Sequence, residues 1–179
     1  MAQNPATLFQ SGTGRSPIWF PDTRESPFAI GIGCIAIGTV TYNIEHFFDD
    51  PNENFFIAAA AVASGQAIIP VTPPGINVSK VFVGQPVTDL TTPAAIPGST
   101  TILSRTTAAI TMSANAASGG ILSGDQIALV TWFTNSGINA QTGNANGNYA
   151  FPVAGISLNI TAGTGSVIAR LIQTTRGYG

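Results

Sequence analysis

The segment TVTYNIEHFFDDPNEN, residues 39–54, gathers the side chains of this sequence best suited to acid–base chemistry or metal binding. It contains the only histidine, His46, and half of the eight acidic residues: Glu45, Asp49, Asp50 and Glu53. An imidazole beside carboxylates can transfer protons or ligate a metal ion, provided that the side chains converge on one point. The function of this segment therefore depends on the element that holds it.

The spacing within this segment favours the end of a strand over a functional site. A calcium-binding loop needs oxygen ligands at D-x-[DN]-x-[DN]-G spacing, which is missing here. Alternation predicts a strand whose apolar face is formed by Val40, Tyr42, Ile44 and His46. Pro51, directly after two aspartates, predicts a turn. We therefore expect His46 to cap the apolar face, the acids to solvate the turn, and no metal site.

Motifs for nucleotide binding and nucleophilic catalysis are also missing from the sequence. The run GIGCIAIG has Gly31 and Gly33 but lacks the third glycine of a dinucleotide fingerprint, and it alternates like a strand. The sole lysine, Lys80, follows Ser79 rather than a glycine, which excludes a P-loop. No G-x-S-x-G segment presents a serine nucleophile. These patterns argue against nucleotide-dependent and hydrolytic enzymes of the common classes.

The remaining reactive groups are few. A glycosidase needs two carboxyl groups facing each other in a cleft, and only the 49–53 turn or the isolated Asp89 and Asp125 could supply them. Cys34 is the only cysteine, so it forms no internal disulfide, and its apolar neighbours predict a buried, inert thiol. We therefore predict that the protein is not an enzyme and needs no cofactor.

The composition favours association with other protein surfaces. Charged residues make up only 8% of the chain, against about 25% in an ordinary soluble domain. With 44% hydrophobic residues and a net charge of −2, there is little repulsion to keep copies apart. The six basic residues are scattered, which argues against a nucleic-acid partner. The apolar runs at 30–37 and 55–63 are too short to span a bilayer, and no signal peptide is expected.

Both ends of the chain show strand periodicity. Residues 28–34 alternate between apolar and small side chains, Ile35 and Ile37 follow, and Gly38 can turn or bulge the strand. In the last third, runs at 156–161 and 167–171 alternate around the glycine-rich AGTGS, which predicts a hairpin turn. The segment TGNANGN predicts another tight turn. We expect the first and last thirds to pair in one sheet.

The middle of the chain has a different texture, rich in Ala, Thr, Pro and Gly. Short β-prone bursts predict small strands: AIIPV, KVFVG, TTILSRT, AAITMSAN and QIALVTWF. FFIAAAAVA, residues 55–63, predicts one short helix, because Asp50, Pro51 and Glu53 suit the positions that begin a helix. At the N-terminus, Pro5, Pro17 and SGTG predict an extended arm without a regular element.

Together these patterns predict an all-β fold, an antiparallel, jelly-roll-like β-sandwich with an inserted β module and an extended N-terminal arm. The predicted boundaries are 1–25 for the arm, 26–54 plus 130–179 for the sandwich, and 55–129 for the inserted module.

Two stretches are similar to known phage proteins. The outer segments resemble small structural proteins of tailed bacteriophages, which share an early P-F strand, then GTVTYNIEHFFDDP, a tryptophan segment, GNYAFPV and a closing NITAGTGSV. The middle stretch VGQPVTDLTTPAAIPGSTTILSRTTAAITMSANA resembles β modules of phage fibres, capsid appendages and bacterial surface proteins. Ile96, Pro97, Gly98 and residues 100–102 carry that match, and residues 113–116 complete it. Ser99 occupies the position of the small residue before threonine, and DLTTPAA lengthens the preceding loop.

The resemblance implies a virion structural protein of the capsid decoration (cement) type. Its partners would be the major capsid protein and its own copies, as a homotrimer, with the inserted module facing outward. It would be made in the bacterial cytoplasm and would end on the capsid surface of the virion. The alternative is a tail, spike or head-fibre component whose inserted module binds a host-surface glycan.

On this interpretation the N-terminal arm contacts the capsid and neighbouring subunits, and deletion of residues 2–20 should leave the fold intact. The candidate contact residues are Phe9, Arg15, Ile18, Trp19, Phe20 and Arg24. Trp132 and Tyr149 are candidate surface aromatics, which either stack on sugars or anchor a core or a subunit interface.

Overall fold

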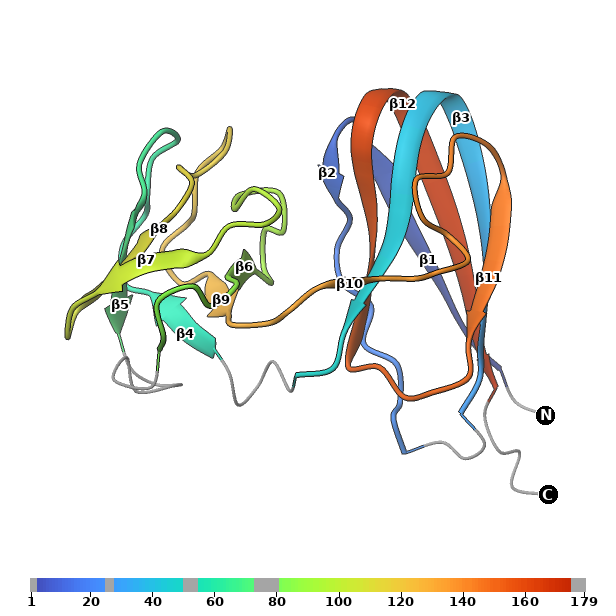
Figure 1. Ribbon diagram of the computed structural model, residues 1–179, viewed down its shortest axis with the longest axis horizontal. Helices are drawn as coiled ribbons and strands as arrows, with labels where there is room; N and C mark the ends of the chain where they lie inside the picture. Colours follow the sequence, from blue (N-terminus) through green and yellow to red (C-terminus); the bar gives the residue numbers. More distant parts are fainter. Residues whose placement is uncertain (1–2, 25–27, 50–54, 73–80, 175–179) are drawn as a thin grey trace. The chain divides into compact units, whose positions relative to one another are not determined.

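The computed structural model describes residues 3–24, 28–49, 55–72 and 81–174. The chain forms two compact units: unit 1 comprises Met1–Phe48 and Trp132–Gly179, and unit 2 comprises Asp49–Thr131. Every regular element of the described residues is a β-strand, so the all-β prediction is confirmed (Figure 1). Among the described residues there is no helix that could cross a membrane. The inserted unit begins six residues earlier and ends two residues later than the predicted 55–129.

Unit 1 is built on two long antiparallel strands, β3 (Ile30–Phe47) and β12 (Gly155–Thr174), which pair along nearly their whole length. Both ribbons arch over at the same level, so each strand contributes one half to each of two facing layers (Figure 1). The two layers enclose the apolar side chains between them. The predicted antiparallel β-sandwich is therefore confirmed, and the first and last thirds of the chain do share one sheet.

The bend in these two strands depends on glycine. Gly38 (φ 84°) pairs with Gly165 (φ 155°) across the two strands. Gly163 (φ 96°) lies opposite Val40, and a Cβ there would collide with the carbonyl oxygen of Thr39. A bulge after Ile160 adds to the bend. The prediction that AGTGS is a hairpin turn was wrong, because the segment stays paired with β3 throughout. Glycines that permit close backbone approach look like turn glycines in the sequence.

Shorter strands complete the two layers. The first layer adds β1 (Gln3–Ser11) beside β12 and β11 (Ala145–Tyr149) beside β3; the second adds β2 (Gly14–Arg15) and β10 (Phe133–Thr134). The predicted tight turn in TGNANGN was wrong in part, since its last residues lie in β11 and pair with the start of β3. Asparagine and glycine are tolerated there because β11 has only one strand neighbour.

The N-terminal segment belongs to the sheet, so the predicted arm was wrong for residues 3–15. The amide of Gly12 donates to the carbonyl of Gly165 at 2.9 Å. Antiparallel pairing alternates, so even-numbered residues of β1 bond to β12 while odd-numbered ones turn their backbone groups to the free edge. Pro5 occupies a free-edge position, where its missing N–H costs the sheet nothing. Deleting residues 2–20 would remove two strands and therefore cannot leave the fold intact.

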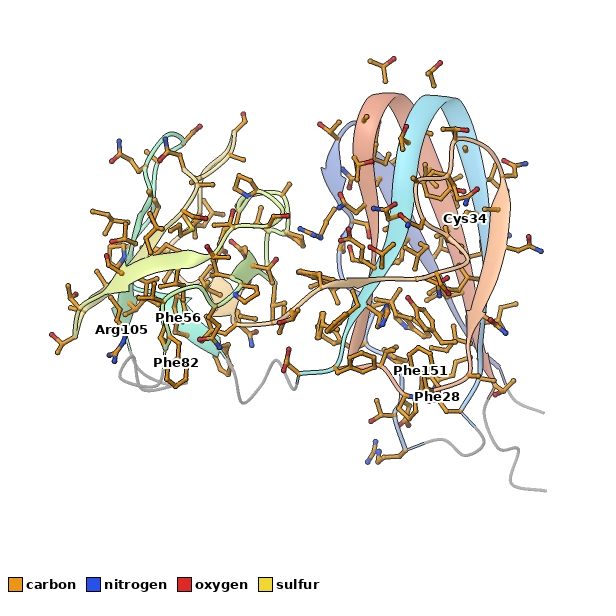
Figure 2. All side chains as sticks on the ribbon, viewed as in Figure 1. Phe28, Cys34, Phe56, Phe82, Arg105 and Phe151 are labelled. Carbon is orange, nitrogen blue, oxygen red and sulfur yellow. The ribbon has the colours of Figure 1, made fainter. Side chains whose placement is uncertain are left out.

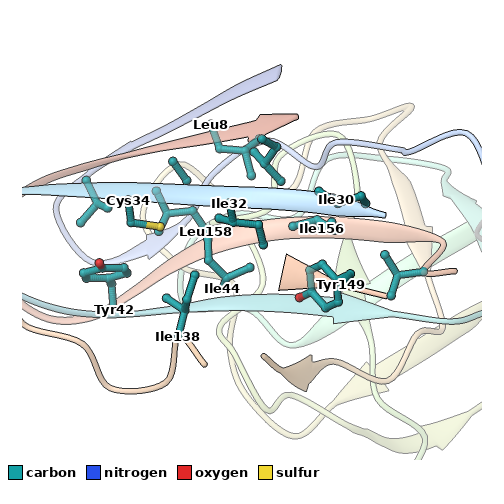
Figure 3. Packing of buried hydrophobic residues seen from close by; sticks show 14 of the residues in the cluster. Leu8, Ile30, Ile32, Cys34, Tyr42, Ile44, Ile138, Tyr149, Ile156 and Leu158 are labelled. Atoms are coloured by element: carbon teal, nitrogen blue, oxygen red, sulfur yellow. The ribbon is translucent and has the colours of Figure 1, made fainter. Parts of the chain in front are cut away.

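Between the layers of unit 1 lies a continuous apolar core (Figure 3). Its fully buried members come from both halves of each long strand, including Ile30, Ile44, Leu158 and Leu171. Tyr42 is buried among them, and its hydroxyl donates to the carbonyl of Gly143 at 2.8 Å. Cys34 is buried as predicted, and burial raises the pKa of its thiol to about 11.

Unit 2 contains a second antiparallel sheet, of strand order β6-β9-β4-β5-β8-β7. The strands are short: β4 (Phe55–Ala58), β5 (Ile68–Thr72), β6 (Thr88–Asp89), β7 (Ile102–Arg105), β8 (Ala109–Met112) and β9 (Gln126–Ala128). Four of the five predicted bursts contain strands, but KVFVG has none in its described residues.

The predicted helix at 55–63 was wrong. Phe56 and Ala58 are buried and alternate with half-buried neighbours in β4, which pairs with β5 on one side and β9 on the other. Sheet pairing on both sides outweighs the helix preference of the alanines. The residues predicted to begin the helix, 50–54, lie outside the described residues.

Candidate functional site

The cluster around His46 is divided between two faces of β3. His46 points into the end of the sandwich and is buried, whereas its neighbour Glu45 points to the opposite side. Asp49 accepts a hydrogen bond from the amide of Thr131 at 3.1 Å. Because β3 ends at Phe47, the strand-end prediction is confirmed. Asp50 and Glu53 lie outside the described residues, and no group of three His, Cys, Asp or Glu residues within the described ranges could hold a metal ion.

Aromatic rings surround His46. Its Nδ1 lies 3.1 Å from the hydroxyl of Tyr149, and the ring centroids of Tyr149 and Phe48 are 4.9 and 5.1 Å away. Phe133 and Phe151 lie at 5.9 and 6.0 Å. Burial lowers the pKa of His46, which favours a neutral ring. Tyr149 is itself fully buried, so the prediction of a surface aromatic was wrong for this residue.

The three phenylalanines of this group, Phe48, Phe133 and Phe151, are about half exposed. Phe151 lies with Phe28 at the end of unit 1 away from the bend (Figure 2). The arrangement closes the end of the sandwich with rings. The polar group that lies against His46 is the buried hydroxyl of Tyr149, and burial raises the pKa of that hydroxyl.

A second group lies on the outward side of the second layer. Arg15 Nε donates to Glu45 Oε2 at 2.7 Å, and the two side chains are only 8% and 9% exposed. Asn159 donates to the other oxygen of Glu45 at 2.9 Å. The guanidinium carbon of Arg15 lies 4.8 Å above the ring of Trp132. Arg15 and Trp132, both proposed from the sequence for binding, therefore contact each other and are mostly enclosed.

The other predicted contact residues are spread along the same segment. Ile18 and Trp19 are half-buried, and Trp19 exchanges two backbone hydrogen bonds with Ile156 at 2.9 Å. Phe20 is exposed. Arg24 is almost completely exposed and pairs with Asp22 at 3.3 Å. The segment thus runs along the edge of β12 in the second layer, and the structure does not bring its candidate residues together into one site.

Phe9 lies elsewhere, on the solvent side of the first layer. Cross-strand pairing places it beside Ile168, and Ile168 beside Ile35, in a row across β1, β12 and β3. Ile37 and Ile172 extend this surface along the strands. Phe9, Ile35, Ile37 and Ile172 are 43–54% exposed although they are large apolar residues, and Ile168 is half-buried. We call this surface the outer face; it comprises Pro5, Thr7, Phe9, Gly31, Gly33, Ile35, Ile37, Ile168, Arg170 and Ile172.

The outer face is large enough to be a binding surface. Three strands at a spacing of about 4.8 Å, over eight residues of about 3.4 Å each, cover roughly 400 Å². On a typical monomer the largest exposed apolar patch is of this size and often functional. Pro5 blunts the free edge of β1, so a partner would meet this surface through its side chains rather than by adding a strand.

Sequence reasoning missed all of the outer face except Phe9. The available signal was a change in the apolar pattern of β3. Up to Cys34 the large apolar side chains point into the core, whereas Ile35 and Ile37 are apolar residues at outward positions. Ile172 is an outward residue in a strand whose inward positions are already apolar. The rows themselves depend on pairing between segments more than a hundred residues apart, which periodicity cannot supply.

Unit 2 holds a buried pair of carboxyl groups that the sequence analysis treated as isolated. Asp89 Oδ1 accepts hydrogen bonds from the amides of Thr91 and Thr92, both at 2.8 Å, and Asp125 Oδ2 accepts from the amide of Leu122 at 2.8 Å. Desolvation and the neighbouring Asp125 raise the pKa of Asp89 to about 7. Both residues are almost fully buried, so no substrate reaches them in this structure.

Comparisons of the chain with protein-family models, with curated proteins and with solved structures found no match.

Proposed function

We propose that this chain is a structural protein of a bacteriophage virion, which binds the outer surface of the capsid through protein–protein contacts and stabilises the lattice. The observation that carries the proposal is the outer face, an exposed apolar sheet surface in a chain with very few charges. The phage-like motifs of the sequence are the reason for proposing a bacteriophage capsid as the lattice that it binds.

The size of the outer face agrees with a protein that acts in many copies. If the whole of the roughly 400 Å² were apolar, its burial would contribute at most about 10 kcal/mol, at about 25 cal/mol per Å². The polar Thr7 and Arg170 within the face lower that figure. Association costs about 4–15 kcal/mol in lost freedom, so one such contact alone binds weakly. A homotrimer bound at three neighbouring positions multiplies modest affinities. We therefore propose a homotrimeric decoration protein rather than a monomeric one.

The experiment adds purified protein to capsids of the encoding phage that were assembled without it, followed by sedimentation. Phe9→Asp places a charge on the outer face at an exposed position and should reduce binding at least tenfold. Leu103→Asp, at an equally exposed apolar residue of unit 2, is the matched control and should bind like the unaltered chain. Absence of binding by the unaltered chain, or equal binding by both variants, would contradict the proposal.

The alternative of a glycan-binding fibre or tail component depended on aromatic side chains. In the described residues of unit 2 the only well-exposed aromatic ring is Phe82, and Tyr149 of unit 1 is buried. No observation therefore favours the alternative, and a few copies of the chain per particle would be the result that revives it.

A further inference from the structure

Arg170 lies in the middle of the outer face and is its only charged residue. Pairing places it between Thr7 of β1 and Gly33 of β3. The row with Phe9 lies on one side of it, and the row with Ile172 lies on the other. Its side chain is exposed, and among the described residues no carboxylate forms an ion pair with it. Within the part of the chain that the structure describes, this guanidinium therefore has no counter-charge on a mainly apolar surface.

The glycines next to Arg170 leave room for a partner. A Cβ built on Gly31 or on Gly33 would meet nothing within 4 Å, so the surface beside the guanidinium is open. An arginine at the centre of an apolar ring has the arrangement of an interface hot spot, in which the surrounding contacts exclude water. Its planar fork of N–H donors matches a carboxylate, to which it can donate two hydrogen bonds.

We propose that the outer face docks on an apolar protein surface that presents one Asp or Glu carboxylate to Arg170. This inference rests on the proposed function, with the major capsid protein as the partner. A buried guanidinium without a counter-charge would cost binding free energy, so a purely apolar partner surface is disfavoured. The carboxylate also fixes the register of an otherwise featureless contact.

A second copy of this chain is a poorer occupant of the same surface. In a two-fold contact between outer faces, each copy brings the same surface to the other. Arg170 lies near the centre of the face, so the two guanidinium groups would approach each other, with no acid on either face to separate them. Like charges placed together oppose association. The trimer contacts of the proposed function must then lie elsewhere on the molecule.

The test measures the affinity of Arg170 variants for capsids assembled without this chain. Reversing the charge with Arg170→Glu should weaken binding at least about 30-fold, because it places two carboxylates together. Arg170→Gln should weaken it and should also make the remaining binding less sensitive to salt. Arg105→Glu is the matched control: Arg105 is an exposed arginine in β7 of unit 2 (Figure 2), and its reversal should change the affinity less than twofold.

The outcomes separate this inference from the proposed function. Unaltered binding by Arg170→Glu, together with weakened binding by Phe9→Asp, would overturn the carboxylate and leave the decoration function standing. The carboxylate would also be overturned, and the decoration function left standing, if Arg170→Gln bound capsids as tightly as the unaltered chain and with the same salt dependence. If the unaltered chain does not bind capsids, both fail. A change in the oligomeric state of the free Arg170→Glu protein would overturn the inference by showing that a copy occupies the face.

Discussion

The two ion pairs found among the described residues of unit 1 differ in burial and should differ in their contribution to stability. Glu45 bridges Arg15 and Asn159 with little access to water. Glu45→Ala leaves a buried guanidinium unpaired and should lower the free energy of unfolding by about 3 kcal/mol. The measurement is urea unfolding followed by the fluorescence of Trp19 and Trp132, both of which belong to unit 1.

The exposed pair of Arg24 and Asp22 provides the control. Asp22→Ala should leave the free energy of unfolding almost unchanged, because solvent screens the charges of this exposed pair. A loss in Glu45→Ala no greater than that in Asp22→Ala would contradict the enclosed geometry. Replacing both partners, as Arg15→Met with Glu45→Leu, should recover part of the loss.

The bend glycines should tolerate no side chain. Gly163→Ala combines a positive φ with a collision against the carbonyl of Thr39, so it should destabilise unit 1 by roughly 2 kcal/mol or more. Gly143→Ala is the matched change, since its Cβ would meet no atom within 4 Å and its φ is not positive. Thermal unfolding of the two variants distinguishes them, and equal melting temperatures would mean that the strands do not bend at Gly163.

For single residues, the sequence predicts those properties that depend on residues close by in the chain. The burial of Cys34 and the strand end at His46 follow from alternation within a few positions. The enclosure of Arg15 by Glu45 and Trp132 does not, because those partners lie 30 and 117 positions away. Tyr149 was misplaced on the surface for the same reason, since its hydroxyl partner His46 comes from the other end of the chain.

The stability of the two units should change with pH in opposite directions: that of unit 2 should fall as the pH rises, and that of unit 1 should fall as the pH drops. In unit 2, the pKa of Asp89 is raised from 3.8 to about 7, so the folded state binds the proton more tightly than the unfolded state. Stability from this group is present below pH 4 and is lost as the pH rises to about 7. In unit 1, the pKa of His46 is lowered from 6.5, so its contribution is present above pH 6.5 and is lost as the pH falls.

Hydrogen exchange read by mass spectrometry, corrected for the intrinsic rate at each pH, measures the two units separately. Between pH 5 and pH 8, protection of peptides from unit 2 should fall. Asp89→Asn should remove this dependence, because the amide does not titrate, while its oxygen can still accept from the amides of Thr91 and Thr92. Protection of unit 2 that rises with pH in the unaltered chain would contradict the raised pKa of Asp89.

The sequence predicts strands well where one face of the strand is apolar. It predicts them poorly where a glycine or proline that resembles a turn residue instead lies within a strand. The alternation of 40–46 and 156–160 is local, and both segments are strands. AGTGS has the composition of a hairpin turn, because close backbone approach at Gly163 requires the same residue type as a turn. Pro5 indicates a break in regular structure, yet the free edge of a sheet accepts it, and that edge exists only because β1 pairs with β12.

For the whole molecule, the sequence predicted a sandwich unit interrupted by an inserted β module, but it did not predict the outer face. An exposed apolar surface across β1, β12 and β3 is created by the pairing of three distant segments. The proposed decoration function depends on that surface, on a low charge and on motifs that resemble phage proteins. It predicts an abundant protein, because a contact of about 400 Å² is effective only when repeated over a lattice.

The most direct measurement is quantitative mass spectrometry of purified particles of the encoding phage, comparing this chain with the major capsid protein. The proposed function predicts copies close to stoichiometric with the major capsid protein. A handful of copies per particle would contradict it and point to a tail or fibre, and complete absence from the particle would refute a structural role in the virion.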